Sequence, residues 1–336
     1  MMSEERDIKR FWLSIHIYHE STSESLLAEI LYPFLQAMQI AGFVRQFFFI
    51  RYFDQSGPHI RLRLEGDYET MLIQVQPQLE LTLNSLLGDH FIKATEASEA
   101  FEGAPVPEGK RIETLQYINY IPETDRFAGK SGLRIAEDQF AASSKAVLEA
   151  IFAFYPEWDY DQAMGAAIRL HLALLHGSGM EKKKMAEFFH LVCLQWLPRA
   201  FPAASSNMTA EHLALRESET LAYFENSWQQ QETALKDYIQ AIFSLLDSGQ
   251  AFEDIAFEDW RLHSITLWTL LEKAYSKDLL SPRPLQFVTA AFEQLSEREH
   301  LLFHLYADFV HLTNNRLGIS NRDEGFLAYI LWKALS

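Results

Sequence analysis

Cysteine is almost missing from this sequence of 336 residues, in which Cys193 is the only one. A single thiol excludes an intramolecular disulfide and a metal cage built on cysteines. His300 and His304 are four residues apart and His311 follows in the same segment. However, no His-Glu-x-x-His string occurs, and no further ligand has a characteristic spacing. We therefore expect no metal site.

Glycine-rich phosphate-binding loops are missing as well. The sequence contains no Walker A loop, no dinucleotide-binding fingerprint and no Gly-x-Ser-x-Gly nucleophile elbow. Its Gly-Ser-Gly string at 177–179 is too short to cradle a phosphate and is better explained as a helix break. These absences exclude the common nucleotide-dependent classes, and we expect no bound cofactor.

Positive charge is in deficit, with 29 Lys and Arg against 46 Asp and Glu and a net charge of −17. A broad nucleic-acid-binding surface needs an excess of positive charge, so we expect no direct nucleic-acid partner. The acidic balance does not forbid a local basic pocket. No apolar run approaches the length of a transmembrane helix, and the N-terminus lacks the pattern of a signal peptide. We predict a soluble cytoplasmic protein without a membrane span.

The first part of the chain alternates between strand and helix patterns. Strand patterns occupy 11–19, a hairpin within 47–64 and 111–121, and helical patterns occupy about 24–41, which contains Pro33, and about 67–88. Residues 94–110, rich in Glu, Ala, Gly and Pro, are predicted to form an exposed loop. The order β-α-β-β-α-β predicts an α+β fold whose antiparallel or mixed sheet has ferredoxin-like character.

Helical spacing dominates the second part, which has no glycine between Gly179 and Gly249. Neither a linker nor a repeat separates the two parts. We therefore predict one domain, 1–336, with an α+β portion at 1–132 and a mainly helical portion at 133–336.

Three basic residues alternate along the second strand of the hairpin: His59, Arg61 and Arg63. Residues at i, i+2 and i+4 of a strand point to one side of its sheet, so these side chains share a face. Arginine's planar fork suits a carboxylate or a developing oxyanion. The alternative is a solvated strand face whose arginines pair with acidic neighbours.

A second stretch, 120–132, follows the last predicted strand and has turn residues at both ends. Glu123 and Arg126 are three apart on this loop, so the carboxylate could orient the guanidinium. The alternative is a surface turn with a weak ion pair.

A third stretch lies near the C-terminus, where His311, Asn315 and Arg316 follow an apolar helical segment and Gly318 is a plausible helix terminator. A histidine at the end of a buried helix can act as a general acid or base. It can equally be a satisfied structural histidine.

Together the three stretches resemble the glutamate-elimination domain of lantibiotic dehydratases, which also occurs in stand-alone thiopeptide-type bacteriocin biosynthesis proteins. The matching strings are Phe-Phe-Phe-Ile-Arg-Tyr-x-Asp-x-x-Gly-Pro-His-Ile-Arg-Leu-Arg, Tyr-x-x-Glu-x-x-Arg, and His-x-x-x-Asn-Arg. Phe127 replaces the usual Tyr, and Ala128 stands where Gly is common. The order and broad spacing agree over essentially the whole chain.

The resemblance implies a lyase that expels glutamate from glutamylated Ser or Thr of a precursor peptide, leaving dehydroalanine or dehydrobutyrine. Arg63, Arg126 and His311 match the family's main catalytic residues, and Arg61 and Glu123 match supporting positions. His59, Asn315 and Arg316 are further motif residues with substrate-binding or supporting roles. The implied partners are the precursor peptide, with its leader and glutamylated core, and a separate glutamylating subunit, for which 336 residues leave no room. A homodimer stays open.

Two other functions compete with glutamate elimination. Some stand-alone relatives are pyridine synthases, which join two dehydroalanines in a formal [4+2] cycloaddition and depart from the Arg/Arg/His set that this sequence keeps. The other alternative is a non-catalytic module that binds the leader peptide at a sheet edge.

Overall fold

The computed structural model describes residues 10–19, 23–55, 57–87, 115–200, 209–281 and 295–336. The chain forms two compact units. The sheet unit comprises Met1–Pro122 and Phe140–Trp158, and the helical unit comprises Glu123–Gln139 and Asp159–Ser336. Helix α5 (Gly129–Phe154) therefore contributes its first residues to the helical unit and the remainder to the sheet unit.

The sheet unit contains four strands in the order β2-β3-β1-β4, with antiparallel neighbours. Their bounds are Phe11–Tyr18 for β1, Val44–Asp54 for β2, Gly57–Gly66 for β3 and Leu115–Tyr117 for β4. This arrangement confirms the α+β prediction with ferredoxin-like character. Strand β4 is shorter than predicted, and the predicted loop at 94–110 lies outside the described residues.

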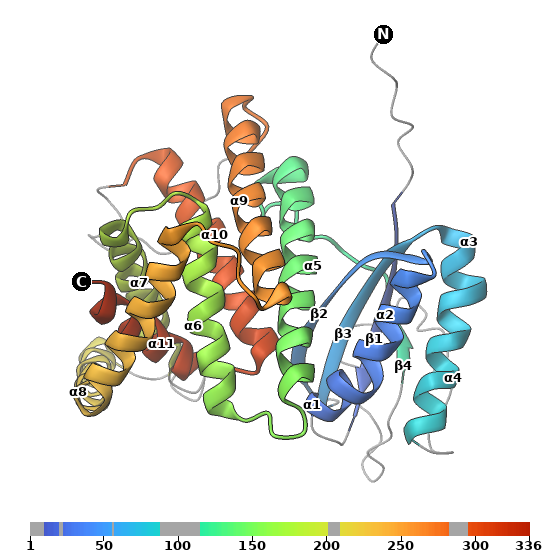
Figure 1. Cartoon of the computed structure of the whole chain (residues 1–336), viewed down its shortest axis with the longest axis horizontal. Coiled ribbons are helices and arrows are strands. Elements are labelled where there is room, and N and C mark those ends of the chain that lie inside the picture. The colour runs from blue at the N-terminus through green and yellow to red at the C-terminus, as the bar shows by residue number, and fades with distance from the viewer. Residues whose placement is uncertain (1–9, 20–22, 56, 88–114, 201–208, 282–294) are drawn as a thin grey trace. The chain divides into compact units, whose positions relative to one another are not determined.

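Two helical segments connect the strands and lie over one face of the sheet (Figure 1). The first comprises α1 (Ser23–Ser25), a π-helical turn (Leu26–Leu31) and α2 (Tyr32–Ile40), and the second comprises α3 (Tyr68–Thr70), a π-helical turn (Met71–Val75) and α4 (Gln76–Leu87). Pro33 lies in the first turn of α2, directly after the π-helical turn, so the continuous helical segment accommodates a residue that has no N–H to donate. Both segments cover an apolar sheet face.

The apolar face follows directly from the alternation of the two central strands. It is formed by Leu13, Ile15, Ile17, Ile60, Leu62 and Leu64, all of which are buried. Because β1 and β3 pair residue for residue, the intervening side chains share the opposite face. Strand β2 is an edge strand, and its Phe49 N–H donates a hydrogen bond to Ser144 Oγ of α5 at 3.1 Å. This bond occupies an edge group that would otherwise be open to pairing.

The helical unit confirms the prediction of a mainly helical second half. Its helices are α6 (Tyr160–Gly177), α7 (Lys182–Trp196), a 3₁₀ turn (Leu197–Ala200), α8 (Ala210–Ser248), α9 (Ile255–Ser276), α10 (Glu297–Leu317) and α11 (Asn321–Leu335). Ser296 caps α10 in a capping box with Glu299, and Gly318 ends the helix with a φ of 81°. None of the described helices is both long and apolar enough to pass through a bilayer.

Replacing two glycines of α6 by alanine is expected to have opposite effects on stability. A Cβ at Gly177 would lie 2.7 Å from Ser264 Cβ of α9, whereas one at Gly165 would meet nothing nearer than Tyr238 Oη at 3.8 Å. We expect Gly177→Ala to destabilise the protein by about 1–3 kcal/mol through overpacking. Gly165→Ala should stabilise it by about 0.5–1 kcal/mol because alanine is the better helix former. Denaturant unfolding of both variants checks this, and equal stabilities would contradict the close approach of α6 and α9.

Candidate functional site

The three basic residues of β3 lie on the sheet face opposite the apolar one, as the alternation predicts. His59, Arg61 and Arg63 pair in register with Tyr18, His16 and Ser14 of β1. Across the other neighbour they pair with Tyr52, Ile50 and Phe48 of β2. The result is a polar face centred on two adjacent arginines and two stacked histidines, His16 and His59, whose ring centroids are 5.0 Å apart.

Arg63 is well enclosed on this face, with only 9% of its surface exposed. Its Nη1 donates to Leu62 O at 3.1 Å, and its Nη2 lies 3.4 Å from His16 Nε2. The guanidinium carbon is 5.8 Å from the centroid of the Tyr120 ring. Burial, and then the charge of Arg61, lower the pKa of Arg63 to about 10, so the group is still cationic at neutral pH. Arg63 is therefore a fixed cation inside a partly dry site.

The neighbouring histidines are neutral supports of this cationic pair. Burial, and next the charge of Arg63, lower the pKa of His16 to about 3. His59 Nδ1 lies 3.2 Å from Gly57 O, and its Nε2 accepts a hydrogen bond from Arg61 Nε at 3.2 Å. Arg61 also lies over the Tyr52 ring at 3.4 Å. These contacts give His59 a position that the sequence left unassigned: it holds Arg61 against the sheet.

Arg126 is held between two carboxylates of the helical unit. Its Nη1 donates to Glu123 Oε2 at 3.0 Å and its Nη2 to Asp308 Oδ1 at 3.0 Å. Burial works against the charge, but the hydrogen bonds to Asp308 and Glu123 outweigh it and raise the pKa of Arg126. The ion pair with Glu123 thus exists as the spacing suggested, and Asp308 of α10 adds a second anchor.

A tight turn brings Arg126 to this position. Arg126 N donates to Glu123 O at 3.1 Å, and Gly129 N donates to Thr124 O at 2.9 Å. Ala128 and Gly129 have φ angles of 59° and 87°, in the left-handed region. A glycine adopts such angles without steric cost, whereas another residue pays roughly 1–2 kcal/mol. The turn therefore explains why glycine is the favoured residue at Ala128.

His311 lies one turn beyond Asp308 on α10, so the two side chains share a helix face. Its Nδ1 is 3.0 Å and 3.1 Å from the two carboxylate oxygens of Glu324, a residue in the first turn of α11. The imidazole lies against Trp196, with ring centroids 4.7 Å apart, and 25% of the side chain is exposed. The second and third sequence motifs therefore meet on one face of α10.

The other two residues of the third motif occupy different environments. Asn315 is half-buried, whereas Arg316 is in the interior of the helical unit with 1% of its surface exposed. Asn314, which precedes them in the sequence, is buried, and its Nδ2 donates to Glu324 Oε2 at 3.4 Å. Arg316 is thus a core residue of the helical unit.

Sequence reasoning missed three side chains that organise these clusters: His16, Asp308 and Glu324. His16 could have been found, because it occupies an alternate position on a strand that was correctly predicted. Asp308 and Glu324 carry no comparable signal, since they meet Arg126 and His311 only after the helices have packed.

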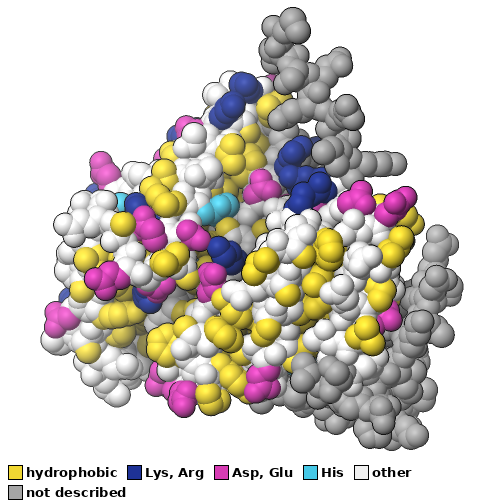
Figure 2. All heavy atoms as spheres, turned by 45° about the vertical axis from the view of Figure 1, so that its right-hand side comes forward, with side chains coloured by type: hydrophobic (Ala, Val, Ile, Leu, Met, Phe, Trp, Pro, Cys, Tyr) yellow, Lys and Arg dark blue, Asp and Glu magenta, His cyan; other side chains and the backbone are white. Residues whose placement is uncertain are grey.

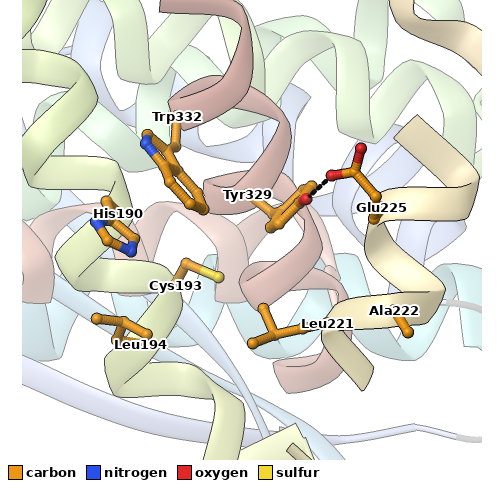
Figure 3. Close-up of a pocket in the computed structure, with 8 residues that line it drawn as sticks. All are labelled: His190, Cys193, Leu194, Leu221, Ala222, Glu225, Tyr329 and Trp332. Atoms are coloured by element: carbon orange, nitrogen blue, oxygen red, sulfur yellow. Dashed lines mark hydrogen bonds between the residues drawn. The ribbon is translucent and has the colours of Figure 1, made fainter. Parts of the chain in front are cut away.

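A separate cavity of about 330 Å³ lies among α7, α8 and α11 (Figure 3). Its wall includes the His190 ring, which stacks on Trp332 with centroids 3.9 Å apart, and the Cys193 thiol. Burial raises the pKa of Cys193 to about 12, so this thiol is not a nucleophile at neutral pH. None of the predicted site residues lines the cavity.

The described residues contain no cluster of metal ligands, and on the face drawn in Figure 2 charges of both signs are mixed. Figure 2 shows one face, on which Lys and Arg side chains form small groups among Asp and Glu. Across the described ranges, no group of three His, Cys, Asp or Glu side chains could hold a metal ion.

Comparisons with known proteins bear on the family and the fold of the chain. A family model described as "Lantibiotic biosynthesis dehydratase C-term" matches residues 12–335. The fold is similar to the crystal structure of TsrL (14% identity, TM-score 0.64, covering 97% of this chain and 94% of that one). It is also similar to TbtD, a pyridine synthase from thiomuracin biosynthesis (16% identity, TM-score 0.65, covering 96% of this chain and 97% of that one). The fold is similar as well to part of the tRNA-dependent lantibiotic dehydratase MibB from Microbispora sp. 107891 (16% identity, TM-score 0.57). This match covers 96% of the present chain but only 28% of MibB. No curated protein sequence matches significantly.

Proposed function

The chain belongs to the family of lantibiotic biosynthesis dehydratase C-terminal domains, and from that premise we propose that it eliminates glutamate from a glutamylated precursor peptide. The substrate carries glutamate esterified to Ser or Thr, and the products are free glutamate and dehydroalanine or dehydrobutyrine. In this proposal a glutamylating partner attaches the glutamate beforehand. The precursor's leader would supply recognition, and its core the reacting residues.

β-Elimination needs the residue types found in two clusters: the basic residues of β3, and the group that Arg126 and His311 form with their carboxylates at α10. The α-proton of a peptide is weakly acidic, so its removal requires a positioned base and donors for the enolate oxygen. The leaving glutamate is anionic and requires cations. His311 would transfer the proton, while Arg63 and Arg126 would bind the glutamyl carboxylates and the developing charge. Glu123 and Asp308 orient Arg126, His16 contacts Arg63, and His59 holds Arg61 beside it.

One observation carries the proposal. Arg126 and His311 come from motifs far apart in the sequence, yet Arg126 bonds Asp308 of α10 at 3.0 Å and His311 lies one turn further along the same helix. His311 is itself held at 3.0 Å by the carboxylate of Glu324. A surface ion pair would not explain why a guanidinium and an imidazole are both held this way. A paired cation and proton carrier is what elimination of a carboxylate requires.

Pyridine synthesis is the second candidate, because the fold is as similar to TbtD as to any of the three solved structures compared above. In that reaction two dehydroalanines are joined and no glutamate leaves. The two functions therefore differ in the substrate they consume, which makes them easy to separate.

Incubating the protein with two peptides tests the proposal. A peptide bearing a glutamyl ester on Ser should lose glutamate, and the corresponding dehydrated peptide should be unchanged, as measured by mass spectrometry. Consumption of the dehydrated peptide with formation of a macrocycle would favour the pyridine synthase instead. Tight binding of the leader without turnover of either peptide would favour a binding module.

A further inference from the structure

Glu324 is a buried carboxylate placed directly behind His311. Only 2% of its surface is exposed, and a carboxylate removed from water must be compensated by partners. Both of its oxygens lie within 3.1 Å of His311 Nδ1, at 3.0 Å and 3.1 Å. A carboxylate can only accept, so Nδ1 carries the hydrogen and donates it.

The carboxylate is itself connected to a second histidine, His171, which is fully buried. Asn314 Nδ2 donates toward Glu324 Oε2 at 3.4 Å, and Asn314 Oδ1 lies 2.7 Å from His171 Nε2. Burial lowers the pKa of His171 to about 4, so this imidazole is neutral at physiological pH and donates its Nε2–H to the amide oxygen. The order of donors is consistent along the chain: His171 to Asn314, Asn314 to Glu324, and His311 to Glu324.

We propose that Glu324 is a positioning residue that fixes His311 in the tautomer with hydrogen on Nδ1, so that Nε2 is the base for α-proton removal. The proposal rests on the glutamate-elimination function and deepens it by assigning the direction of proton transfer at His311. Asn314 and His171 hold the carboxylate in place. The arrangement follows the general logic in which a buried acid orients a catalytic imidazole and stabilises the imidazolium that forms.

The resulting step balances. The Cα–H bond breaks as its proton moves to His311 Nε2, the Cα–Cβ double bond forms, and the Cβ–O bond breaks with its electron pair leaving on the glutamate carboxylate. The imidazolium is then paired with Glu324 through Nδ1–H and afterwards releases its proton from Nε2 to solvent. No oxidant, reductant or metal takes part.

Glu324→Gln and its neighbour Asp323→Asn form a matched pair of variants. Both remove one negative charge from the first turn of α11, but Asp323 bonds Ser320 Oγ and Tyr160 Oη and not His311. We expect Glu324→Gln to lower kcat for glutamate release by about 100-fold or more while KM changes little. Asp323→Asn should keep a kcat close to that of the wild type. Equal kcat values for wild type and Glu324→Gln would overturn the proposal.

The tautomer of His311 gives a measurement that depends on neither activity nor variant folding. In wild-type protein labelled with ¹⁵N-histidine, the ring-nitrogen pattern of His311 at neutral pH should be that of the Nδ1–H tautomer. The Nε2–H tautomer would overturn the proposal directly. If wild-type protein releases no glutamate, the proposed function fails, while the NMR result still decides whether Glu324 fixes the imidazole.

Discussion

Replacing His311 by alanine is expected to reduce the rate of glutamate release from a glutamylated peptide by about 10²–10⁴-fold, the usual contribution of a positioned acid–base group. The imidazole is partly exposed, so its edge can reach a substrate, while its other nitrogen is bonded to Glu324. Loss of the ring removes the proton carrier but leaves the arginines that bind the glutamyl group. The loss should therefore fall on kcat, measured by initial rates of free glutamate.

His212→Ala provides the control for this experiment. His212 is an exposed histidine at the start of α8, where its ring contacts the capping residue Thr209 at 3.1 Å. We expect this variant to release glutamate at the wild-type rate. If His311→Ala also retained wild-type turnover, His311 would not be the proton carrier, and the assignment of the third motif to catalysis would be wrong.

The sheet was predictable because burial imposes a period of two on its central strands. Ile60, Leu62 and Leu64 alternate with His59, Arg61 and Arg63, and shifting the register by one residue would bury the whole basic set. The sequence therefore specified which side chains share a face. It specified less well where pairing stops, since β4 ends at Tyr117 and the chain then carries Tyr120 toward Arg63.

Among the helices, too, some features were predictable from local sequence and others depend on packing. Gly249 and Gly318 end α8 and α10 in left-handed conformations, a local signal that sequence reasoning uses well. By contrast, the π-helical turns at Leu26–Leu31 and Met71–Val75 lie in segments with ordinary helical spacing. Their wider turns depend on how each segment packs, which periodicity does not record.

The candidate residues were identified from motifs, but their partners were not. Glu123 could be paired with Arg126 because three residues separate them, whereas Asp308 is 182 residues away from Arg126. Glu324 is 13 residues from His311 and lies on the next helix. An acidic residue in the first turn of a helix is common, because it favours the helix dipole. Only the packed structure distinguishes Glu324 as a buried partner of His311.

Arg63→Lys is expected to lower kcat for glutamate release by about 10²–10³-fold, although it keeps the positive charge. The guanidinium fork of Arg63 reaches Leu62 O and His16 at once, and its remaining donors are left in a fixed orientation. A lysine ammonium is a flexible point charge that cannot make these contacts and also present two parallel donors to a carboxylate. The effect should appear in kcat more than in KM, because the developing charge is stabilised most in the transition state.

Arg45→Lys is the matched control on the same sheet. Arg45 lies on β2 with 42% of its side chain exposed and pairs at 3.3 Å with the buried carboxylate of Glu65. Arg10 and Gln46 also contact Glu65, so a lysine at position 45 keeps the positive charge beside a carboxylate that has other partners. We expect wild-type kcat for this variant and similar thermal unfolding for both. A loss of activity in Arg63→Lys with an unchanged unfolding midpoint then reports on chemistry and not on the fold. If Arg63→Lys were fully active, charge alone would suffice at this position, and bidentate carboxylate binding by Arg63 would have to be abandoned.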